Sequence, residues 1–228
     1  MDEDVIQKMK PKIIPTIFAK SKQDFDHRFN KMITLSNEIQ IDFMDGHFVR
    51  STGISLADVQ SLKHFKNKFE AHLMVNHPET WIKRLKNKGF HKVIFHYESL
   101  YNFDDIKKII NDIHKEDMEA FIAISPGTHE AKIIEYLPLV DGVLIMGVKP
   151  GKENQTLISK TYLKIRNIRE KNKNIQIQVD GGVNTFNGLK LVEEGADILN
   201  SGSYISTSDN PRGALEELKF SIKKQRNV

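Results

Sequence analysis

The sequence contains no cysteine. Disulfide bonds, thiolate metal ligands and cysteine nucleophiles are therefore excluded, and any metal ion would have to be held by His, Asp or Glu side chains. Because proteins of oxidising compartments often depend on disulfides, a cytoplasmic location is the simplest expectation.

Long apolar runs and a strong excess of one charge are also missing. No run is long enough to cross a bilayer, and Met1–Lys12 is too acidic and too poor in apolar residues for a signal peptide. The 34 basic residues are interspersed with 30 acidic ones, which gives a net charge of only +4. No nucleic-acid-binding motif is present, so we expect neither nucleic acid nor a membrane as a partner.

No linker or break in composition divides the 228 residues. A chain with 39% hydrophobic and 28% charged residues is typical of a globular protein, and this length suits one large domain. We expect a single domain over residues 1–228, with two small domains as the alternative.

What is present is an alternation of short β-branched or apolar runs with longer amphipathic stretches, which is typical of repeated βα units. Strands are predicted over residues 12–18, 38–43, 69–75, 92–96, 119–124, 142–146, 175–180 and 197–200. Helices are predicted over residues 25–35, 55–66, from 78 onward, 103–116, 131–136, 159–170, 186–194 and 211–224. Eight such units predict a closed (β/α)8 barrel. An open doubly wound sheet is the alternative, although no GxGxxG follows the first strand.

The second predicted strand has a polar face that suggests a site. Glu38, Gln40 and Asp42 alternate with apolar residues, so they share one face of the strand. The strand over residues 175–180 repeats this pattern and ends in Asp180. In a barrel the active site lies at the carboxyl ends of the strands. Polar or sulfur-containing residues stand at or near these predicted ends: Asp42, His72, His96, Ser125, Met146, Asp180 and Ser201.

Several short motifs follow one another in an order that a known family shares. They are DFMDGHFV at residues 42–49, HLMV at 72–75, FHYE at 95–98, MGVKPG at 146–151, VDGGV at 179–183 and GS at 202–203. In this order and spacing the chain resembles the ribulose-phosphate 3-epimerase family over nearly its whole length. The resemblance implies a (β/α)8 barrel of the ribulose-phosphate-binding type.

The resemblance also implies a reaction and a metal. Asp42 and Asp180 match the two aspartates that exchange the C3 proton of a ketose phosphate such as D-ribulose 5-phosphate or D-xylulose 5-phosphate. With His72, they match ligands of a divalent metal: Zn, Fe, Mn or Co. Three methionines match residues that cap the reacting centre: Met44, Met74 and Met146. Family members commonly associate, so a homo-oligomer is expected.

Glycine turns after the late strands are candidates for phosphate binding, because backbone N–H groups in such turns hold oxyanions well. Gly181–Gly182 and Gly202–Ser203 fit this role, and Gly151 matches the family's phosphate loop. A sugar phosphate is therefore the expected small-molecule partner.

The chain departs from the family at several positions. Gln40 stands where the family has a fourth metal ligand, a histidine, and an amide oxygen is a poorer ligand for zinc. Ala19 replaces a serine, and Arg50 replaces a proline. The loop over residues 150–155 lacks glycines that let the family's loop close over the substrate, and Lys152 could contact a phosphate through its charge instead.

Two further functions follow from these departures and from the fold. A non-catalytic relative would bind a sugar phosphate or a partner without metal. A decarboxylase or aldolase on the same type of barrel would carry D-x-K-x-x-D on the second strand, but the lysine position holds Met44.

Overall fold

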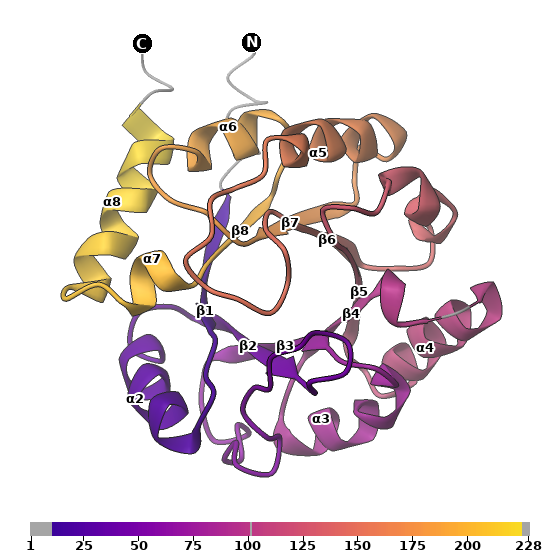
Figure 1. Ribbon diagram of the computed structural model, residues 1–228, viewed down its shortest axis with the longest axis horizontal. Coiled ribbons are helices and arrows are strands. Elements are labelled where there is room, and N and C mark those ends of the chain that lie inside the picture. Colours follow the sequence, from indigo (N-terminus) through magenta and orange to yellow (C-terminus); the bar gives the residue numbers. More distant parts are fainter. Residues whose placement is uncertain (1–10, 101, 225–228) are drawn as a thin grey trace.

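A closed barrel of parallel strands forms the centre of the protein, as Figure 1 shows. The computed structural model describes residues 11–100 and 102–224. The strands follow one another in sequence order, and the eighth pairs with the first. They are β1 (Lys12–Ile17), β2 (Glu38–Met44), β3 (Lys68–Met74), β4 (Lys92–His96), β5 (Glu119–Ile124), β6 (Gly142–Met146), β7 (Gln176–Asp180) and β8 (Ile198–Ser201). The predicted (β/α)8 barrel is confirmed.

Helices surround the ring of strands (Figure 1). They are α2 (Lys22–Met32), α3 (Ile82–Lys88), α4 (Phe103–Lys115), α5 (Lys160–Lys171), α6 (Gly188–Glu193), α7 (Ser203–Ser206) and α8 (Pro211–Lys224). Short 3₁₀ helices are η1 (Pro78–Thr80), η2 (Tyr97–Ser99) and η3 (Glu130–Tyr136). Within the described residues, no helix combines the length and the apolar character needed to span a bilayer.

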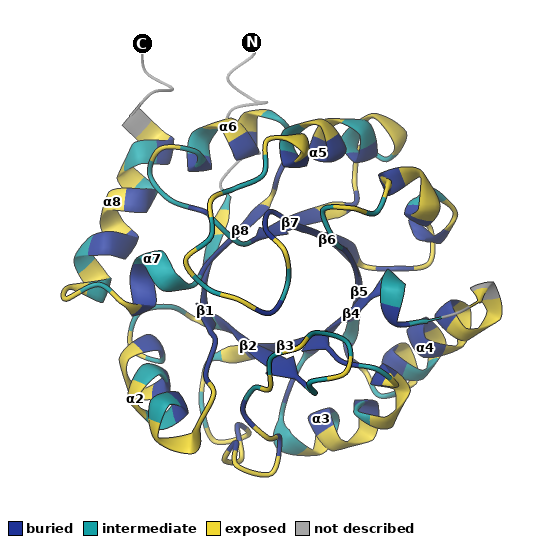
Figure 2. Cartoon of the chain, viewed as in Figure 1, coloured by how far each residue is buried: buried dark blue, intermediate teal, exposed yellow. Residues whose placement is uncertain are grey.

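The two faces of the strands differ in chemistry. The outer face packs against the helices in one large apolar cluster, which includes Ile41 and Phe69. The inner face is polar on β2, β3, β7 and β8, where buried side chains point toward the barrel axis: Gln40, Asp42, Glu70, His72, Gln178, Asp180 and Asn200. Apart from the first residues of several strands, the strands are buried, as Figure 2 shows. Polar groups in such an interior need hydrogen-bond partners, so this side of the barrel is built as a network.

The prediction of a helix over residues 55–66 is wrong, because this segment forms turns. Its apolar residues, Leu56, Val59 and Leu62, are still buried against the barrel. Their backbone groups bond to the neighbouring helix end instead of to one another. The Leu62 amide donates to the Lys88 carbonyl at 2.7 Å, and Lys88 Nζ donates to the Val59 carbonyl. Tertiary hydrogen bonds therefore replace the helix.

Other boundaries differ by smaller amounts. The predicted helix over residues 186–194 begins only at Gly188, because the Asn184 side chain accepts the Phe186 amide at 2.9 Å and makes a turn there. The stretch predicted over 131–136 is a 3₁₀ helix, and α7 was not predicted. The strands at 92–96, 119–124 and 142–146 and the helix at 211–224 match their predicted bounds.

Candidate active site

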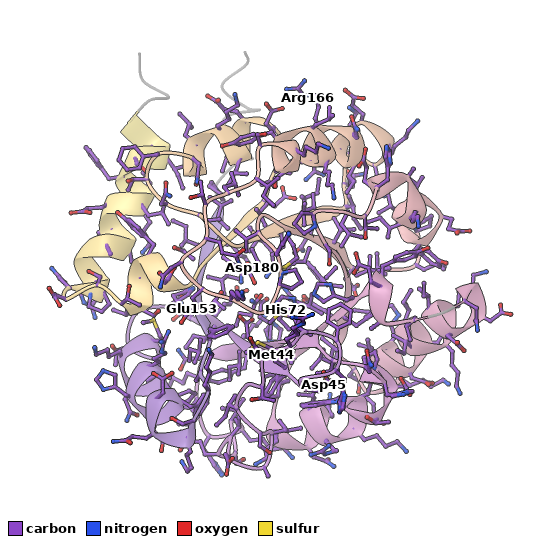
Figure 3. The ribbon with its side chains drawn as sticks, viewed as in Figure 1. Met44, Asp45, His72, Glu153, Arg166 and Asp180 are labelled. Carbon is purple, nitrogen blue, oxygen red and sulfur yellow. The ribbon has the colours of Figure 1, made fainter. Side chains whose placement is uncertain are left out.

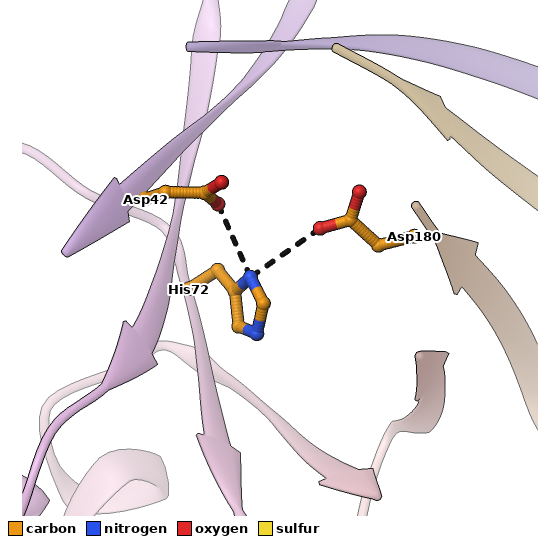
Figure 4. A group of neighbouring side chains, drawn as sticks. All are labelled: Asp42, His72 and Asp180. Atoms are coloured by element: carbon orange, nitrogen blue, oxygen red, sulfur yellow. Dashed lines mark hydrogen bonds and ion pairs between the residues drawn. The ribbon is translucent and has the colours of Figure 1, made fainter. Parts of the chain in front are cut away.

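Three side chains from three strands meet at the carboxyl end of the barrel. Asp42 lies on β2, His72 on β3 and Asp180 on β7. The parallel register places Asp42 directly beside His72, so neighbouring strands deliver both side chains to the same level. Asp180 approaches from the far side of the mouth (Figure 4). The structure thus brings together two aspartates and a histidine that lie far apart in the sequence.

The three groups are within hydrogen-bond reach of one another. His72 Nδ1 lies 3.1 Å from Asp42 Oδ1 and 3.3 Å from Asp180 Oδ2 (Figure 4). His72 is fully buried, and each aspartate is only 6% exposed. One ligand atom from each residue lies within 4.8 Å of the others, which is close enough to hold a metal ion. Two carboxylate oxygens and an imidazole nitrogen are a donor set that suits Zn, Fe, Mn and Co.

Burial and mutual contact shift the pKa values of Asp42 and His72. Burial raises the pKa of Asp42 to about 6, although its hydrogen bond with His72 opposes the shift. For His72, burial lowers the pKa, but the hydrogen bonds to Asp180 and Asp42 outweigh it and raise the pKa to about 10. Without a metal, an imidazolium therefore lies between the two carboxyl groups at neutral pH.

Gln40 takes part in the site as a hydrogen-bond donor. Its Nε2 donates to Asp42 Oδ1 at 2.8 Å and to Asp180 Oδ2 at 2.7 Å. The sequence marks Gln40 as a doubtful metal ligand, but an amide nitrogen has no lone pair for a metal. The three-residue donor set fits a cation, whereas Gln40 as oriented here does not add a fourth ligand.

A second chain of contacts runs from His72 toward the rim. His72 Nε2 lies 3.0 Å from His96 Nε2, and His96 Nδ1 lies 3.1 Å from Glu98 Oε2. Glu98 Oε1 accepts the Ser125 amide at 2.7 Å and the Thr128 hydroxyl at 2.5 Å. Burial raises the pKa of Glu98, but hydrogen bonds from His96, Thr128 and Ser125 outweigh it and lower the pKa to about 2. His96, which the sequence places at a strand end, positions the His72 ring.

The methionines lie at the mouth, but not all in one place. Met74 and Met146 line the pocket above Asp42 and Asp180. Met44 packs with Met74 and Phe18 in a small apolar group at the end of β2, as Figure 3 helps to locate. This group gives the site an apolar wall on the β2–β3 side.

The predicted phosphate-binding glycines all line the same pocket, together with Ser203. Gly181 and Gly182 have φ of +100° and +75°, a region that favours glycine. A Cβ on Gly181 would lie 2.4 Å from the Val148 side chain, and one on Gly182 would lie 2.6 Å from the Leu157 amide nitrogen. Only glycine therefore fits at these two positions, where the turn after β7 packs closely against the loop after β6.

Hydrogen bonds and an ion pair that the sequence did not predict hold this loop over the pocket. Gln155 Nε2 donates to the carbonyls of Lys149 and Lys152 at 2.7 and 2.8 Å, which closes the loop on itself. Lys152 lines the pocket, as expected for a phosphate contact. Arg28 on α2 binds Glu153 in the loop. No local pattern links residues that are 125 positions apart, so only the folded chain reveals this ion pair.

His47 and Asp45 belong to the turn after β2. Asp45 accepts the amides of His47, Phe48 and Asn76 at 2.7–2.9 Å, so it organises this turn. The same hydrogen bonds lower the pKa of Asp45, although burial opposes them. The His47 side chain is exposed.

Comparisons with known proteins can be set beside this geometry. A sequence profile described as "Ribulose-phosphate 3 epimerase family" matches residues 8–206. The chain is 30% identical to a ribulose-phosphate 3-epimerase of Mycobacterium leprae, over 92% of this chain and 95% of that protein. It is 26% identical to one of Schizosaccharomyces pombe, over 95% and 96% of the two chains. A relative from Oryza sativa, 29% identical over 95% and 96%, is named a cytoplasmic isoform.

Solved structures show the same fold at lower identity. A 3-hexulose-6-phosphate synthase superposes with a TM-score of 0.71 and 16% identity, over 92% of this chain and 99% of that one. An orotidine 5'-phosphate decarboxylase from Pyrococcus horikoshii gives 0.67 and 17%, over the same shares. These likenesses are evidence of the barrel fold alone.

Proposed function

We propose that this chain, which belongs to the ribulose-phosphate 3-epimerase family, interconverts D-ribulose 5-phosphate and D-xylulose 5-phosphate or a related pair of ketose phosphates. The relatives named above are epimerases, so the chain is an enzyme of the isomerase class. The substrate and the mechanism are the parts that we propose.

The observation that carries the proposal is the pair of buried aspartates on opposite sides of one mouth. Asp42 and Asp180 come from β2 and β7, and both reach His72 Nδ1. A ketose phosphate bound between them would present one face of C3 to each carboxyl group. Inversion at C3 needs this arrangement, because the proton must leave one face and return to the other.

The proton transfer can be written in two balanced steps. One carboxylate takes the C3 proton, and the C–H electron pair moves to the C2 carbonyl, which leaves an enediolate. The opposite carboxylic acid then gives its proton to the other face of C3, and the carbonyl is restored. Without a metal, burial raises the pKa of Asp42 to about 6, so in that state its carboxyl group can exchange a proton near neutral pH.

A divalent metal fits this site through Asp42, His72 and Asp180. When bound, it would polarise the C2 carbonyl and stabilise the negative charge of the enediolate. Among the residues of the chain itself, His96 orients the His72 ring. Met74 and Met146 line the pocket with apolar surface that keeps water from the reacting carbon.

The phosphate group would lie at the turns after β7 and β8. Gly181, Gly182, Gly202 and Ser203 line the pocket beside the loop after β6. Exposed backbone amides in glycine turns suit an oxyanion, and Lys152 brings a positive charge to the same wall. The sugar would then extend from this wall toward the aspartates.

The experiment is a measurement of C3 proton exchange. Purified protein is analysed for metal and incubated with D-ribulose 5-phosphate in deuterated water, with and without added Mn²⁺. Proton NMR is expected to show loss of the C3 signal and growth of D-xylulose 5-phosphate. Absence of both in the metal-supplemented sample would reject this substrate and mechanism.

The second candidate is a non-catalytic sugar-phosphate-binding relative. The orientation of Gln40, which donates to both aspartates, is the observation that favours it. Phosphate-dependent binding without exchange would support this alternative. A homo-oligomer and a cytoplasmic location stay predictions.

A further inference from the structure

The Gln40 side chain lies where the three candidate metal-binding atoms converge. Its Nε2 is 2.8 Å from Asp42 Oδ1, 2.7 Å from Asp180 Oδ2 and 3.4 Å from His72 Nδ1. One amide nitrogen has two protons, and here each carboxylate receives one. A cation shared by the same three atoms would need the space and the lone pairs that this amide now uses.

The oxygen end of the same amide is held in the opposite direction. Gln40 Oε1 accepts from Asn200 Nδ2 at 2.9 Å, and Gln178 Nε2 lies 3.3 Å from the same oxygen. If the Gln40 amide were rotated by half a turn, its NH₂ group would face the NH₂ groups of Asn200 and Gln178. Its oxygen would then face the carboxylates of Asp42 and Asp180. Both changes cost free energy in a fully buried site.

The direction of the donors below Gln40 is set by a buried carboxylate. Gln178 Nε2 lies 2.6 Å from Glu70 Oε1, and Asn200 Nδ2 lies 3.2 Å from the same oxygen. A carboxylate only accepts, so both neighbouring amides must turn their NH₂ groups toward it.

Glu70 is in turn paired with Lys92. Lys92 Nζ lies 2.9 Å from Glu70 Oε2 and 4.1 Å from the centre of the Phe121 ring. Both Glu70 and Lys92 are almost completely buried, and a buried carboxylate needs such a partner. Gln178 Nε2 also donates to Asn200 Oδ1 at 2.7 Å, which leaves the Asn200 NH₂ group to face Gln40 Oε1. The Glu70–Lys92 pair therefore orients Gln178 and Asn200, and Asn200 in turn orients Gln40.

We propose that Gln40 is a positioning residue that holds Asp42 and Asp180 and competes with a divalent cation for them. The Glu70–Lys92 pair sets its orientation through Gln178 and Asn200. A cation binds Asp42, His72 and Asp180 only when the amide is displaced, so Gln40 weakens metal binding. The importance of this for turnover rests on the proposed function, but the competition itself does not.

The direct test is Mn²⁺ binding to the metal-free protein by isothermal titration calorimetry. If Gln40 competes, Gln40→Ala binds Mn²⁺ at least about tenfold more tightly than the wild type, because two hydrogen bonds to charged groups no longer have to be broken. If Gln40 were a ligand, the same variant would bind Mn²⁺ more weakly. Weaker or unchanged affinity overturns the proposal. Gln40→His cannot serve here, since a new imidazole ligand tightens binding in either case.

A remote variant tests the role of the ion pair without touching a ligand. Glu70→Gln combined with Lys92→Met removes both charges together, which avoids leaving one buried charge unpaired. The amides of Gln178, Asn200 and Gln40 are then no longer held in one direction. We expect the Mn²⁺ affinity to rise about tenfold, which is a typical size of effect for substitutions of residues that surround metal ligands. Glu38→Gln, on the same strand as Gln40 but outside the network, is the matched control and should leave affinity unchanged. Wild-type affinity in the folded double variant overturns this part.

A measurement on the unmodified protein does not depend on how the variants fold. In ¹⁵N NMR spectra the Gln40 side-chain amide, assigned through scalar couplings to its own backbone, should exchange slowly with solvent. Saturation with Zn²⁺ should shift this signal strongly. An unchanged Gln40 signal at saturation contradicts the proposal. None of these readouts uses turnover, so failure of the epimerase assay and failure of this inference are distinguished.

Discussion

Arg28 on α2 binds both carboxylate oxygens of Glu153 in the loop after β6, with Nη1–Oε1 and Nη2–Oε2 distances of 2.8 and 3.3 Å. Arg28 also donates to Asp24 at 2.8 Å, so its guanidinium is fixed from its own helix. Paired, planar contacts of this kind are among the stronger ion pairs. Glu153, which Figure 3 labels, therefore ties the loop over the pocket to the outer helix layer.

Glu153→Gln should loosen this loop. The change keeps the size of the side chain but removes the charge, and a partly exposed pair of this geometry contributes about 1 kcal/mol. Hydrogen exchange of the amides at residues 151–157 should then be about fivefold faster. Lys152→Met, which leaves the ion pair in place, is the control. Equal exchange in Glu153→Gln and wild type would show that the loop is held by Gln155 and packing alone.

Replacement of either aspartate should abolish proton transfer. Asp42→Asn and Asp180→Asn keep the shape but cannot accept or return a proton, so the C3 exchange rate should fall at least about 100-fold in each. Deuterium incorporation into D-ribulose 5-phosphate measures this, with circular dichroism to verify folding. Full activity in both variants would remove the two-aspartate mechanism.

Asp42 should titrate far above an ordinary aspartate in the metal-free protein. Burial raises its pKa from 3.8 to about 6, so the carboxyl group stays protonated until the pH approaches 6. The ¹³C carboxyl signal of Asp42, assigned with Asp42→Asn, should show its main midpoint near pH 6. A single midpoint near 4, the ordinary value for an aspartate, would contradict the described geometry.

Glu98 should stabilise the fold above acid pH. Its pKa is lowered from 4.5 to about 2, so its contribution is fully present above about pH 4.5 and is lost as the pH falls toward 2. The shift corresponds to about 3 kcal/mol at neutral pH. Glu98→Gln should unfold at lower urea concentration than the wild type at pH 7, and the difference should shrink toward pH 2. A difference independent of pH would mean that the charge of Glu98 is not what stabilises the loop at Ser125.

Much of the barrel could be predicted because its strands carry their own signal. Short segments with a central run of apolar residues, such as 92–96 and 119–124, are separated by longer amphipathic stretches, and their ends match the structure. The segment at 55–66 has helical spacing of Leu56, Val59 and Leu62 but folds as turns. Its partner, Lys88, is remote in sequence and satisfies its backbone groups.

The site also has a part that the sequence predicts and a part that only the folded chain reveals. The sequence by itself determined the family, the (β/α)8 barrel and the meeting of Asp42, His72 and Asp180, because alternation along a strand and the position of its end are local properties. The role of Gln40 was decided only by tertiary structure. The direction of its amide depends on Gln178 and Asn200, which are 138 and 160 positions away, and on the buried charge of Glu70 beneath them. An amide has a donor end and an acceptor end, and only its neighbours in space determine which end faces the aspartates.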